Sequence, residues 1–229
     1  MSLIAHILLY IGIAAFILCP IFIFAAMYFI RLNIFIKAQC KNSTKEILFT
    51  FDDGPHPVQT PKVLEVLRRY NVKAMFFLIG ENAEKYPDIV RRIAAEGHSI
   101  GNHTYSHCGK FPIFSAKKMQ EELEKTDNIL QEITGKKVEY FRPPFGITNI
   151  RISRVIRERG YKVTGWNIRS YDTSLTQEKA LNRVIKKLRP HAIILLHDSL
   201  PNSEKLLERI FNYIIHNPEK RQDNKLYFE

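Results

Sequence analysis

The chain is poor in cysteine and shows no sign of repetition. It has only three cysteines in 229 residues, and they lie far apart at Cys19, Cys40 and Cys108. Small secreted domains that depend on disulfides carry a dense framework of cysteines, and this spacing excludes one. No segment repeats, no tract has low complexity, and no change in composition marks a second soluble domain. The sequence therefore predicts a single globular core.

Charge is absent from the stretch between Ile7 and Ile30. A helix of this length, at about 1.5 Å per residue, covers the roughly 30 Å of a hydrocarbon layer. Residues 1–31 are therefore predicted to form a transmembrane anchor, in which Pro20 is tolerated. A buried core helix and a cleaved secretory signal are the alternatives, but a signal begins with basic residues and has a shorter apolar run.

The orientation of this anchor is left open by the flanking charges. No basic residue precedes the apolar stretch, whereas Arg31, Lys37, Lys41 and Lys45 follow it. Positive flanking charge favours the cytoplasmic side, whereas a domain that acts outside the membrane has to face outward. The chain is expected to be a single-pass membrane protein with its globular domain on the outer side of the cytoplasmic membrane.

The formal net charge of +11 raises the question of a nucleic-acid partner. The basic residues, however, are spread as helical doublets such as Arg68-Arg69 and Lys186-Lys187, with no aromatic interleaving and no nucleic-acid motif. No nucleic-acid partner is therefore expected. The charge fits attraction to anionic lipid headgroups or to an anionic envelope polymer.

A linker over residues 32–45 is expected to lead into a catalytic domain over residues 46–229. Short apolar strands alternate there with amphipathic helices, which predicts a parallel sheet with helices outside, either doubly wound or closed into a barrel. The expected strands are 47–51, 74–79, 98–101, 138–141, 162–166 and 192–196.

Several helix boundaries are legible in the sequence. Thr60 is expected to cap a helix with Pro61 at its first position, and Pro87 to open another that stops at Gly97. The other expected cap and stop pairs are Ser115 with Gly135 and Asn149 with Gly160, and the apolar stripe 206–214 predicts a final helix.

Polar side chains follow the expected strands at the same end of the sheet, where parallel α/β folds gather their reactive groups. Among them, Asp53, His103 and His107 supply one carboxylate and two imidazoles, which suits a catalytic divalent ion that keeps a position open for water. The neighbouring Asp52 is then free to act as a base. The residues that directly follow the strands are Asp52, Asp53, His103, Arg142, Asp172 and His197, and His107 lies four residues after His103.

Four ordered segments carry a resemblance to a known family. They are Thr50-Phe51-Asp52-Asp53-Gly54-Pro55, His103-Thr104-Tyr105-Ser106-His107, Arg142-Pro143-Pro144-Phe145-Gly146 and Leu195-Leu196-His197. In this order and spacing they resemble the motifs of the polysaccharide deacetylases, the NodB homology or carbohydrate esterase family 4, over about residues 46–216. The resemblance implies an α/β fold, a distorted and incomplete (β/α) barrel, and metal-dependent removal of acetyl groups from sugars.

The resemblance also implies roles for the residues of the first two motifs. Asp53, His103 and His107 would hold one divalent ion, typically zinc, with cobalt or nickel as substitutes. Asp52 would be the catalytic base, and Arg142 would orient it. Cys108 is a weaker alternative as an extra soft ligand, because free cysteine usually behaves as a small buried hydrophobe.

Further roles follow from the later motifs. The backbone N–H of Phe145 would stabilise the oxyanion, because the two preceding prolines have no N–H. His197 would protonate the leaving amine, Asp172 would orient His197, and Leu195 would line the pocket for the acetyl methyl. The fourth motif departs from the family pattern, since Asn167 and Thr173 stand where many members have Asp and Trp.

The expected activity is removal of N-acetyl groups from a carbohydrate, with an N-acetylated envelope glycan as the first candidate substrate. A lipid-linked sugar at the membrane surface is a second candidate. A non-catalytic glycan-binding protein and a metallophosphoesterase are competing classes, but the motif residues are intact and a second metal's ligands are missing from the sequence pattern. The acetylated sugar, the native metal and the oligomeric state are not predicted.

Overall fold

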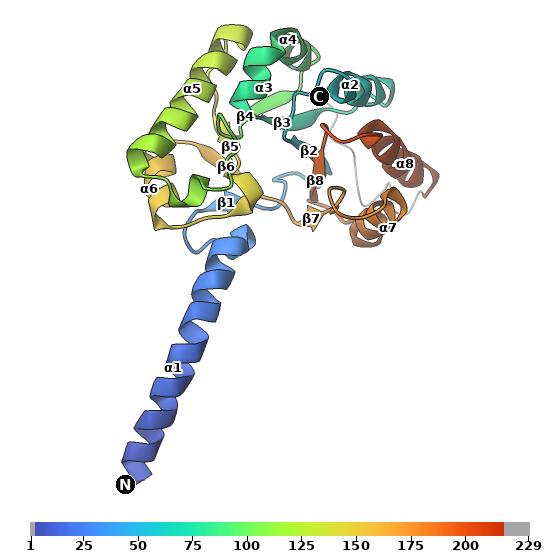
Figure 1. Cartoon of the computed structure of the whole chain (residues 1–229). Coiled ribbons are helices and arrows are strands. Elements are labelled where there is room, and N and C mark those ends of the chain that lie inside the picture. Colours follow the sequence, from blue (N-terminus) through green and yellow to red (C-terminus); the bar gives the residue numbers. More distant parts are fainter. Residues whose placement is uncertain (1–2, 218–229) are drawn as a thin grey trace.

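The computed structural model describes residues 3–217 and shows a curled parallel sheet wrapped by helices, with one long helix projecting from it (Figure 1). The eight strands lie in the order β1-β6-β5-β4-β3-β2-β8-β7, and every pairing is parallel. Their bounds are β1 Ala38–Gln39, β2 Leu48–Asp52, β3 Ala74–Leu78, β4 Ser99–Asn102, β5 Tyr140–Phe141, β6 Lys162–Thr164, β7 Ile168–Arg169 and β8 Ile193–His197.

The short link between β6 and β7 requires the sheet to curl. Six strand-to-strand steps separate these two strands in the sheet order, which would be about 29 Å if the sheet were flat. Thr164 and Ile168 are only four residues apart, so the chain between them reaches at most about 14 Å. The two ends of the sheet therefore approach each other without pairing, which is the incomplete barrel that the motifs predicted.

All six expected strands are present, with ends that differ by a few residues. The structure adds the edge strands β1 and β7, which the sequence did not reveal because each has only two residues. Strand β1 lies within the expected linker 32–45 and pairs with β6, and Ile36 and Ala38 are buried. Part of that segment thus belongs to the sheet and is not a free tether.

The helices cover the outer face of the sheet (Figure 1). Alternate residues of β2 and β3, such as Phe51 and Phe76, pack under them, whereas Thr50 and Phe77 face the barrel interior and Arg142. The helix bounds are α1 Leu3–Tyr28, α2 Gln59–Arg69, α3 Gly80–Lys85, α4 Pro87–Ala95, α5 Ala116–Thr134, α6 Ile150–Arg159, α7 Gln177–Lys187 and α8 Ser203–His216.

Most of the expected helix boundaries are confirmed. Ser115 and Asn149 accept hydrogen bonds from the backbone at the starts of α5 and α6, and Gly135 and Gly160 end these helices in the left-handed conformation. The start of α2 was predicted wrongly: it begins at Gln59, and its first N–H groups donate to Nδ1 of His56. The hydroxyl of Thr60 instead donates to Asp198.

Helix α1 carries the apolar stretch and is joined firmly to the barrel. Its window Tyr10–Tyr28 is long and apolar enough to cross a membrane, with a mean hydropathy of 2.4. At its end, the Met27 carbonyl accepts a 2.9 Å hydrogen bond from the Thr148 N–H, and Ala26 and Ile30 are buried. The barrel therefore sits directly on the end of α1. The outermost residues of the expected anchor and catalytic domain, 1–2 and 218–229, lie outside the described residues.

Candidate metal and catalytic site

The two consecutive aspartates lie where β2 ends, beside the end of β8. The sheet register places Asp52 opposite His197, so a carboxylate and an imidazole from distant parts of the chain are neighbours. Asp53 follows with a φ of 73°, a left-handed conformation that turns its side chain away from the strand direction. Thr104, His107 and Phe145 also have positive φ. Such costly conformations persist only where the surrounding structure imposes them, and here they gather around one site.

Three predicted ligands converge on one point. The carboxylate atom Oδ1 of Asp53 lies 3.5 Å from Nε2 of His103 and 3.3 Å from Nε2 of His107. This Oδ1 is buried without a hydrogen-bond partner, which is costly for a carboxylate oxygen unless a cation or donor satisfies it. One carboxylate oxygen and two imidazole nitrogens within 4.8 Å of one another fit a divalent ion with open positions.

The histidine rings are oriented for this use. Nδ1 of His103 lies 2.8 Å from the Arg142 carbonyl, to which it can donate, and this leaves Nε2 free to face Asp53. The pKa of His107 is lowered to about 4 by burial and by the charge of His103. His107 is thus neutral near pH 7 and ready to bind an ion. Burial lowers the pKa of His103, but the carboxylates of Asp52 and Asp53 outweigh burial and raise it, so an ion would have to displace the proton of His103.

The segment that carries the two histidines, four residues apart, is not helical. The segment is a loop in which Thr104 and His107 are left-handed, and the ring centroids lie 4.8 Å apart. Buried Asn102 holds this loop: its Oδ1 accepts from the Thr104 N–H at 2.7 Å, and its amide donates to Asp127 and to the Leu123 carbonyl.

Arg142 is completely buried and holds Asp52. Its Nη1 donates to Oδ1 of Asp52 at 2.6 Å and to the Thr50 hydroxyl at 2.9 Å. The remaining donors are satisfied by the carbonyls of Thr164 and Gly165, and the guanidinium lies over the Phe77 ring. A buried, fully paired guanidinium of this kind fixes the orientation of the carboxylate that it contacts.

His197 is held by Asp172 from both its ring and its backbone. Oδ1 of Asp172 lies 2.8 Å from Nδ1 of His197, and Oδ2 accepts from the His197 N–H at 2.9 Å. Burial alone lowers the pKa of His197, but the hydrogen bond and charge of Asp172 outweigh it and raise the pKa to about 9. His197 therefore carries a proton near neutral pH, and its Nε2 faces Asp53.

A cavity of about 200 Å³ joins these groups. Leu195, Phe145 and Trp166 form part of its wall, and the Trp166 ring lies against Gly146. Gly146 has a φ of 71°, and a Cβ there would lie 2.4 Å from the Trp166 ring, so glycine permits this wall to close. The N–H groups of Gly146 and Ile147 donate the backbone hydrogen bonds of this turn. The N–H of Phe145 takes no part in these two bonds.

The chain matches a family model described as polysaccharide deacetylase over residues 39–164, more than half its length. It belongs to the polysaccharide deacetylase family. The matched span contains the aspartate pair, both histidines of the metal motif and Arg142, whereas Asp172 and His197 lie beyond it.

Two relatives of this polysaccharide deacetylase family member are named as deacetylases of N-acetylated sugars. The chain is 39% identical over 155 residues to a peptidoglycan-N-acetylglucosamine deacetylase of Bacillus cereus, covering 67% of this chain and 56% of that protein. It is 35% identical over 169 residues to a chitooligosaccharide deacetylase of Azorhizobium caulinodans, covering 73% of this chain and 80% of that protein.

The fold is shared with solved structures of the same kind. The Bc1960 peptidoglycan N-acetylglucosamine deacetylase superposes with a TM-score of 0.72 at 33% identity, covering 83% of this chain and 94% of that one. Other structures that share the fold are described as pseudoenzymes of the family.

Some groups around the candidate site were not identified from the sequence. Trp166 and Arg169 line the cavity, but an isolated aromatic or basic residue gives no motif by which to find it. Thr173, noted as a departure from the family pattern, also lines the cavity. Asn167, noted only as a departure, is structural: its Oδ1 accepts from the Ile193 N–H, and its amide donates to the His191 carbonyl.

Asp198, which directly follows His197, is a second overlooked group. It is fully buried, accepts from the Thr60 hydroxyl, and leaves Oδ1 without a partner among the described residues. Burial raises its pKa to about 7. The folded chain therefore binds more protons than the unfolded chain between about pH 4 and 7, and its stability falls as pH rises through that range.

Replacement of Asp198 with asparagine tests this expectation. Because asparagine resembles the protonated acid, the melting temperature of Asp198→Asn should lie nearest the wild-type value at about pH 4 and exceed it by a growing margin as the pH rises to about 7. Thermal unfolding of the full chain in detergent across this range measures the difference. Equal pH dependence of the two proteins would contradict the assignment of a buried titrating carboxyl to Asp198.

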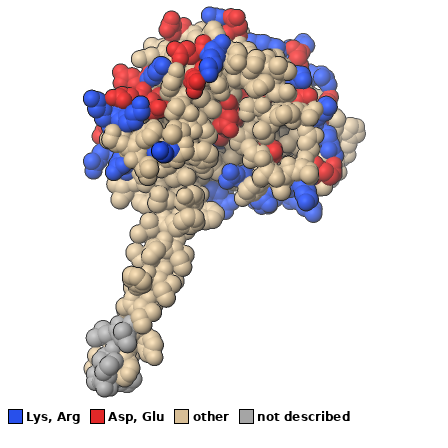
Figure 2. Space-filling model, in the orientation of Figure 1, with Lys and Arg blue, Asp and Glu red and all other residues tan. Residues whose placement is uncertain are grey.

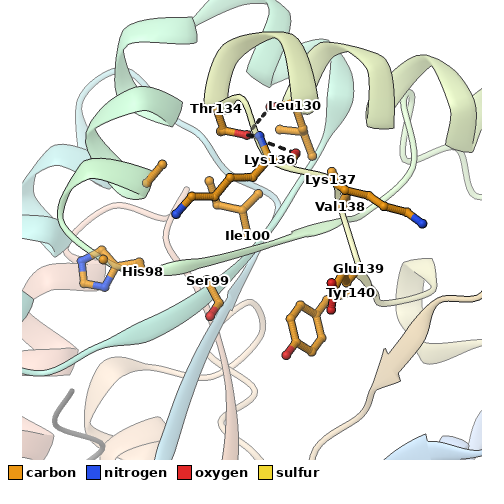
Figure 3. A pocket seen from close by; sticks show the side chains of 12 residues that line it. His98, Ser99, Ile100, Leu130, Thr134, Lys136, Lys137, Val138, Glu139 and Tyr140 are labelled. Atoms are coloured by element: carbon orange, nitrogen blue, oxygen red, sulfur yellow. Dashed lines mark hydrogen bonds between the residues drawn. The ribbon is translucent and has the colours of Figure 1, made fainter.

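A different cavity, of about 280 Å³, lies at the opposite end of the sheet (Figure 3). It is lined where β4 and β5 begin, by residues such as His98, Ser99 and Tyr140, and Lys136 and Lys137 point to different sides of it. The reactive groups of parallel barrels lie at the carboxyl ends of the strands. This cavity is therefore separate from the one that is lined by Asp53, His103 and His197.

Proposed function

We propose that the chain is a metal-dependent N-deacetylase of a glycan that contains N-acetylhexosamine. One observation supports the proposal most directly. In a single cavity, a set of ligands for one ion lies between the carboxylate of Asp52, which Arg142 orients, and the protonated ring of His197. Asp53, His103 and His107 would hold the ion, with zinc as the first candidate. When bound, a divalent ion supplies Lewis acidity toward the acetyl carbonyl and toward water.

Asp52 is suited to take a proton from the attacking water. Its Oδ1 is occupied by Arg142, and its Oδ2 lies 3.8 Å from Nε2 of His103, on the side of the ligand set. Arg142 fixes the direction of this carboxylate through the 2.6 Å hydrogen bond to Oδ1. A positioned general base of this kind contributes about 10²–10⁴ to a reaction rate.

His197 is suited to supply the proton that the leaving nitrogen needs. As water adds to the acetyl carbon and the C–N bond breaks, the amine leaves with the Nε2 proton of His197, and acetate is released. Asp172 fixes Nδ1 of the ring through its 2.8 Å contact and favours the protonated form. Asp172 is therefore a positioning residue and does not itself meet the substrate.

The remaining walls suit the acetyl group. The Phe145 N–H, unused by its own turn, is the donor we assign to the developing oxyanion. Leu195, which is 3% exposed, offers an apolar surface to the methyl group. Thr173 lines the cavity where many relatives have tryptophan, so one stacking wall is replaced by a smaller side chain.

Membrane attachment through α1 is part of the proposal. The helix has the length and hydropathy of a membrane span, and the described part of its surface shows no charge (Figure 2). Relatives named for peptidoglycan support an envelope glycan as the substrate and the outer side of the cytoplasmic membrane as the location. Because this chain matches 56% of the first relative's length, that relative's substrate is carried over only as a proposal.

Acetate release by the full chain in detergent tests the proposed activity. The enzyme is offered N-acetylglucosamine oligomers, peptidoglycan and an extracted membrane lipid fraction, each with chelator, with added zinc and with zinc after chelation. We expect the enzyme to release acetate from at least one of these substrates. Chelation should abolish this release, and added zinc should restore it. A chain that binds one ion but releases no acetate from any sample would instead favour a glycan-binding role.

A further inference from the structure

A basic cavity of about 250 Å³ lies where the end of α1 meets the barrel. It is lined from three separate parts of the chain: the residues after α1, the β6–β7 link with β7, and helix α7. Its lining includes four cationic side chains and no acidic one. The cations are Arg31, Arg169, Arg183 and Lys187.

These cations have no acidic partner among residues 3–217, since none lies within 4.0 Å of a carboxylate there. Other arginines of the chain, such as Arg92 and Arg159, do pair with carboxylates. Lys187 lies in the last turn of α7, where the helix dipole favours a cation in any helix. The dipole does not explain why Arg183 and Arg169 are placed in the cavity without a carboxylate partner. The cavity therefore concentrates positive charge that its own walls leave uncompensated.

The two central arginines are held in place before any ligand arrives. The ring of Tyr171 contacts both guanidiniums, at 4.8 Å from Arg169 and 4.4 Å from Arg183. Nε of Arg183 also donates to the Arg169 carbonyl at 2.9 Å, which leaves its terminal nitrogens free. Guanidiniums fixed in this way are suited to bidentate contact with phosphate oxygens.

The position of the cavity matches the depth of lipid phosphates. Tyr28, the last residue of α1, contributes to its wall, and Arg31 follows three residues later. With α1 in a bilayer, aromatic and basic residues at this point lie at the headgroup level. Figure 2 shows basic residues on the face of the domain beside the upper end of α1.

The basic cavity adjoins the deacetylase site. Trp166 and Arg169 line both cavities, so an anion in one lies beside a sugar in the other. The bond between Thr148 and Met27 fixes the barrel against α1, which sets the height of both cavities above the membrane.

We infer that the basic cavity binds the phosphate or diphosphate that joins the acetylated sugar to a membrane lipid. The inference rests on the proposed N-deacetylase function and narrows its substrate to a lipid-linked amino sugar. The phosphate of a bulk anionic phospholipid has the same chemistry, and the experiment separates the two sources.

The test compares two substrates on the full chain in nanodiscs of phosphatidylcholine. One is a neutral N-acetylglucosamine oligomer, and the other is N-acetylglucosamine linked through diphosphate to a prenyl chain. The variant Arg183→Gln/Lys187→Gln is compared with Lys179→Gln/Lys186→Gln, which removes the same charge from exposed positions of α7 outside the cavity. The KM for the diphosphate substrate should rise about tenfold per cation lost in the first variant only. Turnover of the neutral oligomer should stay within about twofold.

Binding is followed separately from turnover through the fluorescence of Trp166, the only tryptophan in the chain, which lines both cavities. The diphosphate lipid should change this fluorescence at a concentration about a hundredfold higher in Arg183→Gln/Lys187→Gln than in wild type, in keeping with two lost charged contacts. Binding of this kind without acetate release would leave the phosphate site standing and overturn the N-deacetylase function.

Three results would overturn the inference while leaving the N-deacetylase function intact. The first is equal loss of activity on both substrates, which would make the basic cavity a structural element. The second is unchanged kinetics for the diphosphate substrate in the variant. The third is a response to phosphatidylglycerol nanodiscs alone, with no selectivity between substrates, which would assign the cavity to bulk lipid headgroups.

Discussion

Replacement of Asp53 with asparagine is expected to empty the metal site and to lower acetate release at least about a hundredfold. Loss of groups that only orient a ligand already costs about 10–100-fold in metal affinity or activity, and Asp53 is itself a ligand in this account. Asparagine tolerates the left-handed φ of 73° at this position, so the fold should survive the change. Ion content per chain, measured after equilibration with buffered zinc, gives the direct readout.

The control for Asp53→Asn removes a carboxylate elsewhere. Asp88 is 93% exposed and, within residues 3–217, pairs only with Arg91 on the surface of α4. Asp88→Asn should keep one ion per chain and full activity. If Asp53→Asn also kept one ion per chain, the ligand set proposed from Asp53, His103 and His107 would be wrong.

Replacement of Arg142 with methionine is expected to have the largest effect on folding. The change leaves the Asp52 carboxylate buried without its partner, and breaking a buried ion pair from one side costs about 3–5 kcal/mol. For a chain of this size, that corresponds to a fall of about 6–20 °C in melting temperature. Thermal unfolding in detergent measures it.

The double variant Arg142→Met/Asp52→Asn identifies the cause. With both charges removed, the desolvated carboxylate is gone, and the double variant should be more stable than Arg142→Met alone. Equal stability of the two variants would mean that packing of the long Arg142 side chain, and not its charge, is what the barrel requires. Asp52→Asn alone should cost less, since its amide oxygen still accepts from Arg142.

The fold was predictable to the extent that its signals are local. Strands such as 74–79 are continuous apolar runs, and the caps Ser115 and Asn149 act within their own helices, so both kinds of prediction were confirmed. Strands β1 and β7 have two residues each and exist because a neighbouring strand offers a partner, which no local pattern reveals. The cap at His56 was missed because histidine is not a typical capping residue.

The site was predictable in composition but not in arrangement. The motif residues Asp52, Asp53 and His103 are brought together as expected because successive parallel strands deliver their ends to one edge. The geometry of His107 depends on left-handed residues in a loop, and the charge of the basic cavity depends on Arg31 and Arg183 meeting across the fold. Contacts between residues that are far apart in the chain produce no recognisable spacing of residues in the sequence.

The most direct measurement of the central claim pairs ion content with acetate release for wild type and Asp52→Asn. Both proteins are loaded with the same divalent ion and offered the substrate that the wild type deacetylates. The account predicts equal ion content and a rate lower by about 10²–10⁴ in the variant, because Asp52 is the base and not a ligand. A variant that releases acetate at the wild-type rate, or that loses its ion, would contradict the division of roles between Asp52 and Asp53.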